Sequence, residues 1–488
     1  MSRNRVRRMS MKWVRNSRIA FIFIFLLLSP QLVYAAEIDG AQLSLWWGVP
    51  FVATLLSMAV IPLVRPVFWH HHYGKVIAFW ALSFLIPFTF LFGIDASVHG
   101  LAHVLLAEYL PFILLLTALF VVGGGIYIKI DVKGTPWVNG CFLIIGSCLA
   151  SVMGTTGASM LLIRPLLRAN AHRTYRIHTV VFFIFMVSNI GGSLSPLGDP
   201  PLFLGFLKGV DFFWTFNHLL GQTLFLLVSL LVIFLGIDFW TCSLERKNGI
   251  VQPQKKEADK TKAGFAISGK INFVLLLCIV GFVLLSGIWR SDVSFNILGT
   301  EVSLPGLVRD VGLIAVAVCS MVLTGKEVRN LNEFDWEPMK EVAKLFSGIF
   351  LTIIPVIAML HAGTEGVFAP IVNAVTDAEG QPVPMMYFWA TGMLSSFLDN
   401  APTYLVFFNT AGGDASILMT SLAKALMAIS AGAVFMGANT YIGNAPNLMV
   451  KAIADGAGVK MPSFFGYMVW SFGILLPLFF ITSLIWYR

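Results

Sequence analysis

The chain has 488 residues, of which 57% are hydrophobic and 12% are charged, and its mean hydropathy is +0.82. This composition indicates a protein that crosses a membrane many times, and it excludes an ordinary soluble domain. The net charge of +8 does not indicate a nucleic-acid partner, because most basic residues occur in short loops, where they set topology. The five cysteines lack metal-site spacing, so we expect no cofactor and no metal beyond a transported cation.

The N-terminus has the pattern of a signal peptide, which we place at residues 1–35. Residues 1–18 contain seven basic side chains and no acidic one, and an apolar run follows from Ile19 to Leu28. Small residues at Ala35 and Ala36 then form a cleavage site. The apolar run is too short to span a bilayer easily, although an uncleaved anchor is the alternative interpretation.

The rest of the chain predicts an all-α polytopic membrane protein with ten spans and two re-entrant hairpins. In the first half, spans are expected near 46–64, 76–93, 103–128, 177–205 and 217–238. In the second half they are expected near 271–289, 308–325, 346–361, 417–450 and 462–486. The hairpins are predicted at 136–168 and 385–410, one in each half.

Loop charges predict the orientation of the two halves. Basic residues flank the first hairpin, so it should enter from the cytoplasm, and the Lys-rich stretch 241–270 should be a cytoplasmic linker. Residues 362–384 contain acidic residues but no Lys or Arg, so the second hairpin should open outside. Each half has five crossings, an odd number. The halves 36–240 and 271–488 should therefore form an inverted repeat in the cell membrane.

Polar segments rich in Gly and Pro interrupt both halves at a constant offset of 245 residues, so that Gly198 corresponds to Gly443 and Pro201 to Pro446. Such segments cannot continue a regular helix, and they free backbone carbonyls and amides. A single break is usually a packing kink, but matched breaks in two halves point to a transporter's binding site. The glycines and prolines predicted to shape the hairpin tips and breaks are Gly154, Gly157, Gly198, Pro201, Pro402, Gly443 and Pro446.

Asp199 and Asp399 are the leading candidates for binding a cation or a proton. Each lies in one of these breaks, and a carboxylate within a membrane is costly unless it is paired or functional. The alternative for each is a structural role, in which the carboxylate caps the following helix. Neutral oxygens for the same site are expected from Asn400, Asn189, Thr155, Thr156, Ser188, Asn439, Thr440 and Asn444, although any single one could instead cap a helix.

Other polar residues within or beside the spans are weaker candidates. Glu108 lies in the third predicted span and is a second-tier candidate for a proton path, although nearby Pro111 allows an interfacial position instead. Lys208 and Asp238 lie near predicted span ends and are expected at the membrane interface. The run His70–His72 is expected in a solvated loop rather than at a metal site.

The order of hairpin and broken span, repeated and inverted, resembles the ion transporter superfamily over residues 46–486. Within it, Leu398–Thr403 and Ser195–Asp199 are similar to motifs of the NhaD-type sodium/proton antiporters, and citrate transporters and arsenite-pump membrane subunits share related patterns. The first hairpin tip departs from the antiporter pattern. It reads Gly154–Gly157, where an acidic residue is expected. The resemblance also implies that the protein can form a homodimer.

These observations predict a secondary transporter that exchanges a monovalent cation, sodium, for protons by alternating access. The alternative is a sodium- or proton-coupled carrier of an organic anion such as citrate, and a channel is a third class. Two ionised aspartates would repel a carboxylate substrate, which favours the cation. The sequence shows no nucleotide-binding loop and no nucleophile–base constellation, so we expect neither an ATP-driven pump nor an enzyme.

Overall fold

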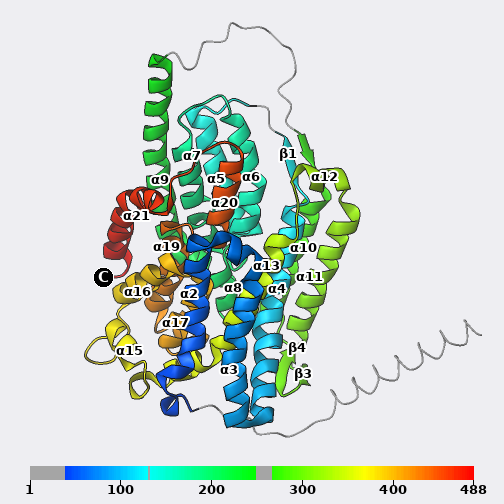
Figure 1. The fold of residues 1–488 in the computed structure, drawn as a ribbon, viewed down its shortest axis with the longest axis vertical. Helices are drawn as coiled ribbons and strands as arrows, with labels where there is room; N and C mark the ends of the chain where they lie inside the picture. The colour runs from blue at the N-terminus through cyan, green and yellow to red at the C-terminus, as the bar shows by residue number, and fades with distance from the viewer. Residues whose placement is uncertain (1–38, 130–131, 249–265) are drawn as a thin grey trace, which may run out of the picture.

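The computed structural model describes residues 39–129, 132–248 and 266–488 (Figure 1). The predicted signal peptide and most of the predicted linker lie outside these residues. Within them, strands are confined to two short antiparallel pairs. β1 (Tyr127–Lys129) pairs with β2 (Ala266–Ser268), and β3 (Ser294–Ile297) pairs with β4 (Thr300–Ser303). All other regular elements there are helices, which confirms the predicted all-α polytopic fold.

The helices of the first half follow two short 3-10 turns, η1 (Gly40–Gln42) and η2 (Leu45–Gly48). They are α2 (Val49–Val64), α3 (Pro66–His103), the π-helix η3 (Val104–Tyr109), α4 (Leu110–Gly123), α5 (Pro136–Met153), α6 (Thr155–Ala169), α7 (Ile177–Met186), the 3-10 turn η4 (Ile190–Leu194), α8 (Pro200–Leu207) and α9 (Trp214–Lys247). Both the first hairpin, α5–α6, and the broken span, α7–η4–α8, occur where the sequence predicts them.

The second half begins with α10 (Ile271–Ile288) and ends with α21 (Phe464–Trp486). Between them lie α11 (Leu304–Leu323), α12 (Lys326–Leu331), α13 (Glu337–Thr352), α14 (Ile354–His361), η5 (Gly363–Glu365), α15 (Ala369–Val375), α16 (Pro384–Phe397), α17 (Asn400–Thr410), α18 (Ala415–Met419), α19 (Ala423–Met436), η6 (Gly437–Asn439) and α20 (Ala445–Gly456). The second hairpin is α16–α17, and the second broken span is α19–η6–α20.

In the described part of the chain, eight helices are long and apolar enough to span a membrane, or nine if the pair α13–α14, bent by 41°, counts as one span. Two of the ten predicted spans fall in one helical stretch of 58 residues from Pro66 to Gly123. Gly93, with φ 89° and ψ 165°, divides this stretch, and the helix resumes directly after it rather than at residue 103. The predicted span 417–450 is divided among α18, α19 and α20, so no single helix there is long enough.

Two helices are longer than the sequence suggests. His70–His72 lie within α3 and not in a loop, because Pro66 starts the helix at a position where its missing N–H costs nothing. At the other end of the first half, α9 continues to Lys247 and so includes the start of the stretch predicted as linker. Both extensions contain polar residues, so hydropathy alone does not distinguish them from loops.

The helices form two groups that lie side by side in Figure 1. In what we call the hairpin bundle, α5–α9 pack with α16, α17 and α19–α21, and contacts between the halves join α6 to α20 and α17 to α8. In the flanking bundle, α2, α3, η3, α4, α10, α11 and α13 pack against one another. We call the end where α9 stops and β1 pairs with β2 the linker end, and the end with β3 and β4 the opposite end (Figure 1).

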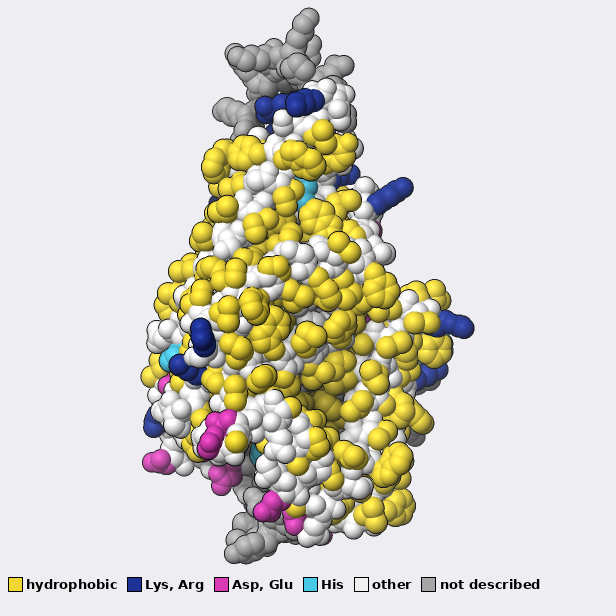
Figure 2. Space-filling view, turned by 90° about the vertical axis from the view of Figure 1, so that its left-hand side faces the viewer, with side chains coloured by type: hydrophobic (Ala, Val, Ile, Leu, Met, Phe, Trp, Pro, Cys, Tyr) yellow, Lys and Arg dark blue, Asp and Glu magenta, His cyan; other side chains and the backbone are white. Residues whose placement is uncertain are grey.

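Exposed apolar side chains cover the middle of the molecule. Figure 2 shows hydrophobic side chains over most of the central part of one face, with acidic side chains gathered toward its lower end. Large side chains such as Phe90 and Trp46 are at least 80% exposed, which would be costly in water but suits contact with lipid tails. The surface therefore fits a membrane protein with several spans.

Candidate functional site

The two hairpin tips and the two helix breaks meet inside the hairpin bundle. The first tip turns at Gly154, whose φ of 81° favours glycine because a Cβ would be strained there. The amide of Thr155 in this tip donates to the carbonyl of Gly198 in the first break, at 2.8 Å. The second tip turns at Leu398 and Asp399 without a left-handed residue. The tips therefore differ in backbone as well as in sequence.

The two breaks, by contrast, repeat the same local structure at the offset of 245 residues. Ser195 donates its hydroxyl to the backbone carbonyl of Ser151, and Thr440 donates to the carbonyl of Ser396 at 2.5 Å. Backbone angles also agree: Asp199 has φ −143° and ψ 144°, and its counterpart Asn444 has φ −151° and ψ 139°. Each hydroxyl fastens its break to the hairpin of the same half, so the offset seen in the sequence corresponds to repeated contacts.

A pair of glycines in each break brings the backbone into close contact with itself. A Cβ placed on Gly198 would lie 2.0 Å from the carbonyl oxygen of Gly192, and a Cβ on Gly443 would lie 2.6 Å from that of Gly437. No side chain fits at either position, so glycine is required there for steric reasons. The prolines Pro201, Pro402 and Pro446 each lie in the first turn of the helix that follows, where proline is tolerated.

The carboxylate of Asp199 lies where all four segments meet. It is 2% exposed, and it accepts hydrogen bonds from the hydroxyl of Thr155 in the first hairpin at 2.9 Å and from the amide of Asn444 in the second break at 3.0 Å. Its other oxygen accepts from the amide of Asn400 in the second hairpin at 2.5 Å. Asp199 itself belongs to the first break, so one carboxylate joins both hairpins and both breaks.

A chain of buried asparagines continues from this carboxylate. The amide of Asn444 also donates to the side-chain oxygen of Asn189 and to the carbonyl of Ser188, both at 3.2 Å. Asn189 in turn donates to Asn447 at 2.7 Å, and Asn447 donates to backbone carbonyls of the second break. Asn447 was missed in the sequence. An asparagine directly after the Ala-Pro pair of a break, on an otherwise apolar stretch, is the signal that could have identified it.

Asp399 has a different environment from Asp199. It is half-buried, it precedes α17, and one carboxylate oxygen accepts the backbone amide of Ala401 at 3.1 Å. This is the contact of a helix cap, as the structural alternative anticipated. Asp399 lines the same cavity as Asp199 but makes none of the contacts that surround the Asp199 carboxylate. The sequence names both aspartates as leading candidates, and the geometry places Asp199 at the centre.

The remaining residues predicted to supply oxygen ligands make contacts with groups other than the Asp199 carboxylate. The hydroxyl of Ser188 pairs with that of Ser159 at 2.8 Å, and the hydroxyl of Thr440 holds the second break. Thr156 and Gly157 line the cavity described below, and neither of these described residues forms a hydrogen bond with Asp199. Asn439 donates its amide to the hydroxyl of Ser396 at 2.9 Å and so links the second break to the second hairpin.

Two of the predicted ligands carry an unpartnered oxygen. The side-chain oxygens of Asn400 and Asn439 are buried and have no hydrogen-bond donor among the described residues. A buried carbonyl oxygen without a donor is costly, and such oxygens are usually satisfied by water or an ion. Neutral amide oxygens beside a carboxylate are ligands that hard monovalent and divalent cations accept. The Asn400 oxygen, on a side chain that contacts Asp199, is therefore available as a ligand for an ion or a water molecule.

A cavity of about 850 Å³ connects the tips to the linker end of the molecule. Near the breaks its wall includes Asp199 and Asp399, and farther out it is lined by α20 and by Asp335 and Glu337 at the start of α13. Five carboxylates line it, from Asp199, Asp335, Glu337, Glu341 and Asp399. Its described lining contains no Lys or Arg. Lys340 beside the mouth pairs with Glu337 at 3.3 Å. Apart from these carboxylates and His70 the lining is neutral, and acidic groups along a cavity concentrate cations.

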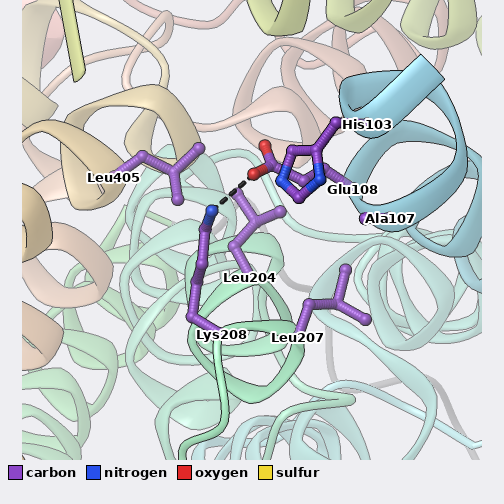
Figure 3. Close-up of a pocket in the computed structure, with 7 residues that line it drawn as sticks. All are labelled: His103, Ala107, Glu108, Leu204, Leu207, Lys208 and Leu405. Atoms are coloured by element: carbon purple, nitrogen blue, oxygen red, sulfur yellow. Dashed lines mark hydrogen bonds and ion pairs between the residues drawn. The ribbon is translucent and has the colours of Figure 1, made fainter. Parts of the chain in front are cut away.

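Glu108 does not line this cavity but a second, smaller one of about 240 Å³, together with residues at the end of α8 (Figure 3). It is 7% exposed, and its carboxylate forms an ion pair with Lys208 at the end of α8. Glu108 is thus enclosed by protein, while its depth in the membrane stays a prediction. Lys208 lies at the end of its helix as the sequence predicts, and its side chain points into this cavity.

Asp238, predicted near a span end, lies in a buried polar cluster. It is fully buried and pairs with Arg173, with His178 at 2.8 Å and with the amide of Asn139 at 2.9 Å. Glu245 completes the group through Arg173 at 3.1 Å. These contacts fasten both ends of the first hairpin to α9 near the linker end. The charges come from residues 65 to 72 positions apart, so local sequence could not pair them.

Comparison with known proteins agrees with this geometry at the level of transport. A family model described as "putative citrate transport" matches residues 40–487. Two proteins described as uncharacterised transporters, from Mycobacterium bovis and Mycobacterium tuberculosis, are each 25% identical over 339 residues, which cover 67% of this chain and 72% of theirs. The antiporter subtype suggested by the short motifs has no counterpart among these matches.

Proposed function

The chain belongs to the transporter family described as "putative citrate transport", and from that premise we propose that it is a secondary transporter in which Asp199 binds a monovalent cation, sodium, in exchange for a proton. The observation that carries this proposal is the position of the Asp199 carboxylate, which is held by donors from both hairpins and from the opposite break. A group that joins four moving segments can report its occupancy to all of them.

One buried carboxylate can hold one positive charge at a time. A cation that arrives through the cavity competes for Asp199 with a proton and with the three hydrogen-bond donors. Rotation of the Asn400 amide would turn its unpartnered oxygen toward the cation and withdraw its N–H from the carboxylate. Binding of the cation therefore releases the proton and loosens the contact between the second hairpin and the first break, and this competition is the basis of exchange.

The charge of the cavity supports a cation as the species that enters from the linker end. Carboxylates at the mouth, Asp335, Glu337 and Glu341, and those at the breaks attract cations along the whole path. The same field repels a free tricarboxylate. Because the linker end is predicted to be cytoplasmic from its basic loops, the structure corresponds in this proposal to a state open to the cytoplasm.

A second candidate is a cation-coupled carrier of an organic anion such as citrate, and the description of the matching family favours it. A cation held at Asp199 would offset one negative charge and leave α8 and α20, whose N-termini lie in the breaks, to attract a carboxylate. In that mechanism Asp199 keeps its role and only the cargo changes. The two candidate functions therefore share the Asp199 site and differ in the transported solute, which is sodium in the first and an organic anion in the second.

The test is transport by the full chain in proteoliposomes with an imposed pH gradient and a pH dye in the lumen. Sodium, lithium, potassium or citrate is added in separate trials. Exchange predicts that sodium alone collapses the gradient, and that Asp199→Asn prevents this while Asp211→Asn, an exposed acid outside the breaks, does not. A response that requires citrate would replace the first candidate with the second. No response to any solute would reject both.

A further inference from the structure

The smaller cavity lies between the two bundles, on the far side of the breaks from the large one. One wall is formed by α8, which begins next to Asp199 and ends at Lys208, and by α17, which begins at the second hairpin tip and contributes Leu405. The other wall is formed by His103 and Glu108 near η3. Since α8 and α17 run away from the breaks, this cavity lies between Asp199 and the opposite end of the molecule.

The ion pair in this cavity joins elements of different bundles. Lys208 belongs to the hairpin bundle, and Figure 3 shows its side chain crossing the cavity to the carboxylate of Glu108, with the ring of His103 beside it. Glu108 belongs to η3, which packs against α3, α4 and α13 of the flanking bundle. The side chains of Glu108 and Lys208 are 9% and 26% exposed. Charges this enclosed stay paired, because separating them leaves one buried without a partner.

The local backbone suits a position that must change. Residues 104–109 form a π-helix between two α-helical stretches, a geometry that is rare and is often found at functional positions. The π-turn places Glu108 on the face toward α8, where it meets Lys208.

We propose that the Glu108–Lys208 ion pair is a gate that closes the path from Asp199 to the opposite end while the large cavity is open at the linker end. This inference rests on the proposed function only in requiring that access to Asp199 alternates between the two ends. For access from the opposite end, α8 must separate from η3, and the ion pair is the charged contact between them. Breaking it therefore favours the state that is open at the opposite end.

The test compares the labelling of two reporter cysteines in a chain whose five native cysteines have been replaced. Leu405→Cys lies in the small cavity and Ala452→Cys lines the large one. A membrane-impermeant maleimide is applied to vesicles of each orientation. In Glu108→Gln and Lys208→Met we expect labelling at 405 from the opposite end to rise about tenfold, and labelling at 452 from the linker end to fall. Tenfold corresponds to about 1.4 kcal/mol in the balance of the two states.

Two controls distinguish an ion pair that controls access to Asp199 from one that only stabilises the fold. Lys451→Met breaks an ion pair with Asp455 that lies within one helix, α20, and it should leave both labelling rates unchanged. Exchanging the charges, Glu108→Lys with Lys208→Glu, should restore the labelling of the unaltered pair. Unchanged labelling in folded single variants, or a rise at 405 that the exchange does not reverse, would overturn the proposal. Labelling requires no transport and no particular ion, so a failed transport assay leaves this result interpretable.

Discussion

The two halves of the protein share a backbone frame but distribute charge differently. In both breaks a hydroxyl fastens the segment to its own hairpin, and a glycine pair closes the turn. The side chain that points to the meeting point, however, is Asp199 in the first half and Asn444 in the second. At the hairpin tips the order is reversed, with Gly154 in the first half and Asp399 in the second. The repeat therefore supplies geometry, while chemistry comes from the differences.

This comparison explains why the site has one centre and not two. Asn444 donates to Asp199, so the break without an acid becomes a partner of the break with one. Two aspartates facing each other at this point would repel, and two asparagines would carry no charge for a cation. Because the two breaks differ at this position, a single carboxylate, that of Asp199, accepts hydrogen bonds from Thr155, Asn400 and Asn444.

Asp199→Asn should have the largest effect. Asparagine keeps the shape of the side chain but can hold neither a proton nor a cation, so we expect sodium–proton exchange to fall at least about a hundredfold, equivalent to about 2.7 kcal/mol. The measurement is the initial rate of gradient collapse in proteoliposomes, corrected for the amount of protein inserted. The variant Asn444→Ala, which removes only a donor, is the comparison. Near-normal exchange in Asp199→Asn would remove this residue from the mechanism.

Gly198→Ala and Gly443→Ala test the shared frame. A methyl group would meet backbone oxygen in both, at 2.0 Å in the first half and 2.6 Å in the second, so each should lower stability by about 1–3 kcal/mol, with Gly198→Ala the more severe. Thermal unfolding in detergent gives the order directly. Gly157→Ala is the matched control, since its new methyl would lie 3.5 Å from the flexible side chain of Met153. Equal stability of all three would contradict the close-contact account.

The sequence predicted this frame well because its signals are local. Gly and Pro interruptions defined the hairpins at 136–168 and 385–410, and the structure has them at 136–169 and 384–410. The sequence did not predict the buried ion pairs and hydrogen bonds that join residues far apart in the chain. Glu108 and Lys208 are 100 positions apart, and Asp238 finds its partners 60 to 99 positions away, so neither burial could be read from neighbouring residues. Hydropathy also placed a loop after Gly93, although a single glycine suffices for the turn.

Exchanging the two break residues, Asp199→Asn with Asn444→Asp, tests whether the halves are interchangeable. The side chains are already 3.0 Å apart, so the exchange moves the carboxylate across one hydrogen bond while keeping an amide beside it. We expect the double variant to exchange about tenfold faster than Asp199→Asn alone, without full recovery, because Thr155 and Asn400 are placed around the original position. Transport rates of the single and double variants in parallel provide the comparison. No recovery would mean that the donors, and not the charge alone, define the site.

Asp399→Asn should have the smallest effect on exchange. Its carboxylate lines a wide cavity and makes a single cap contact, so removing its charge weakens the attraction for cations without removing the ligand at the centre. We expect exchange to fall about threefold, less than 1 kcal/mol, and this loss to shrink at high ionic strength, where screening weakens the field of the cavity.

Stability separates the two roles of Asp399. Asparagine caps a helix about as well as aspartate, so Asp399→Asn should unfold at an unchanged temperature, whereas Asp399→Ala loses the contact with the Ala401 amide and should cost about 1 kcal/mol. If Asp399→Asn abolished exchange as completely as Asp199→Asn, both acids would belong to one binding centre. The two halves would then each supply one acidic ligand to the same centre, Asp199 from a break and Asp399 from a hairpin tip.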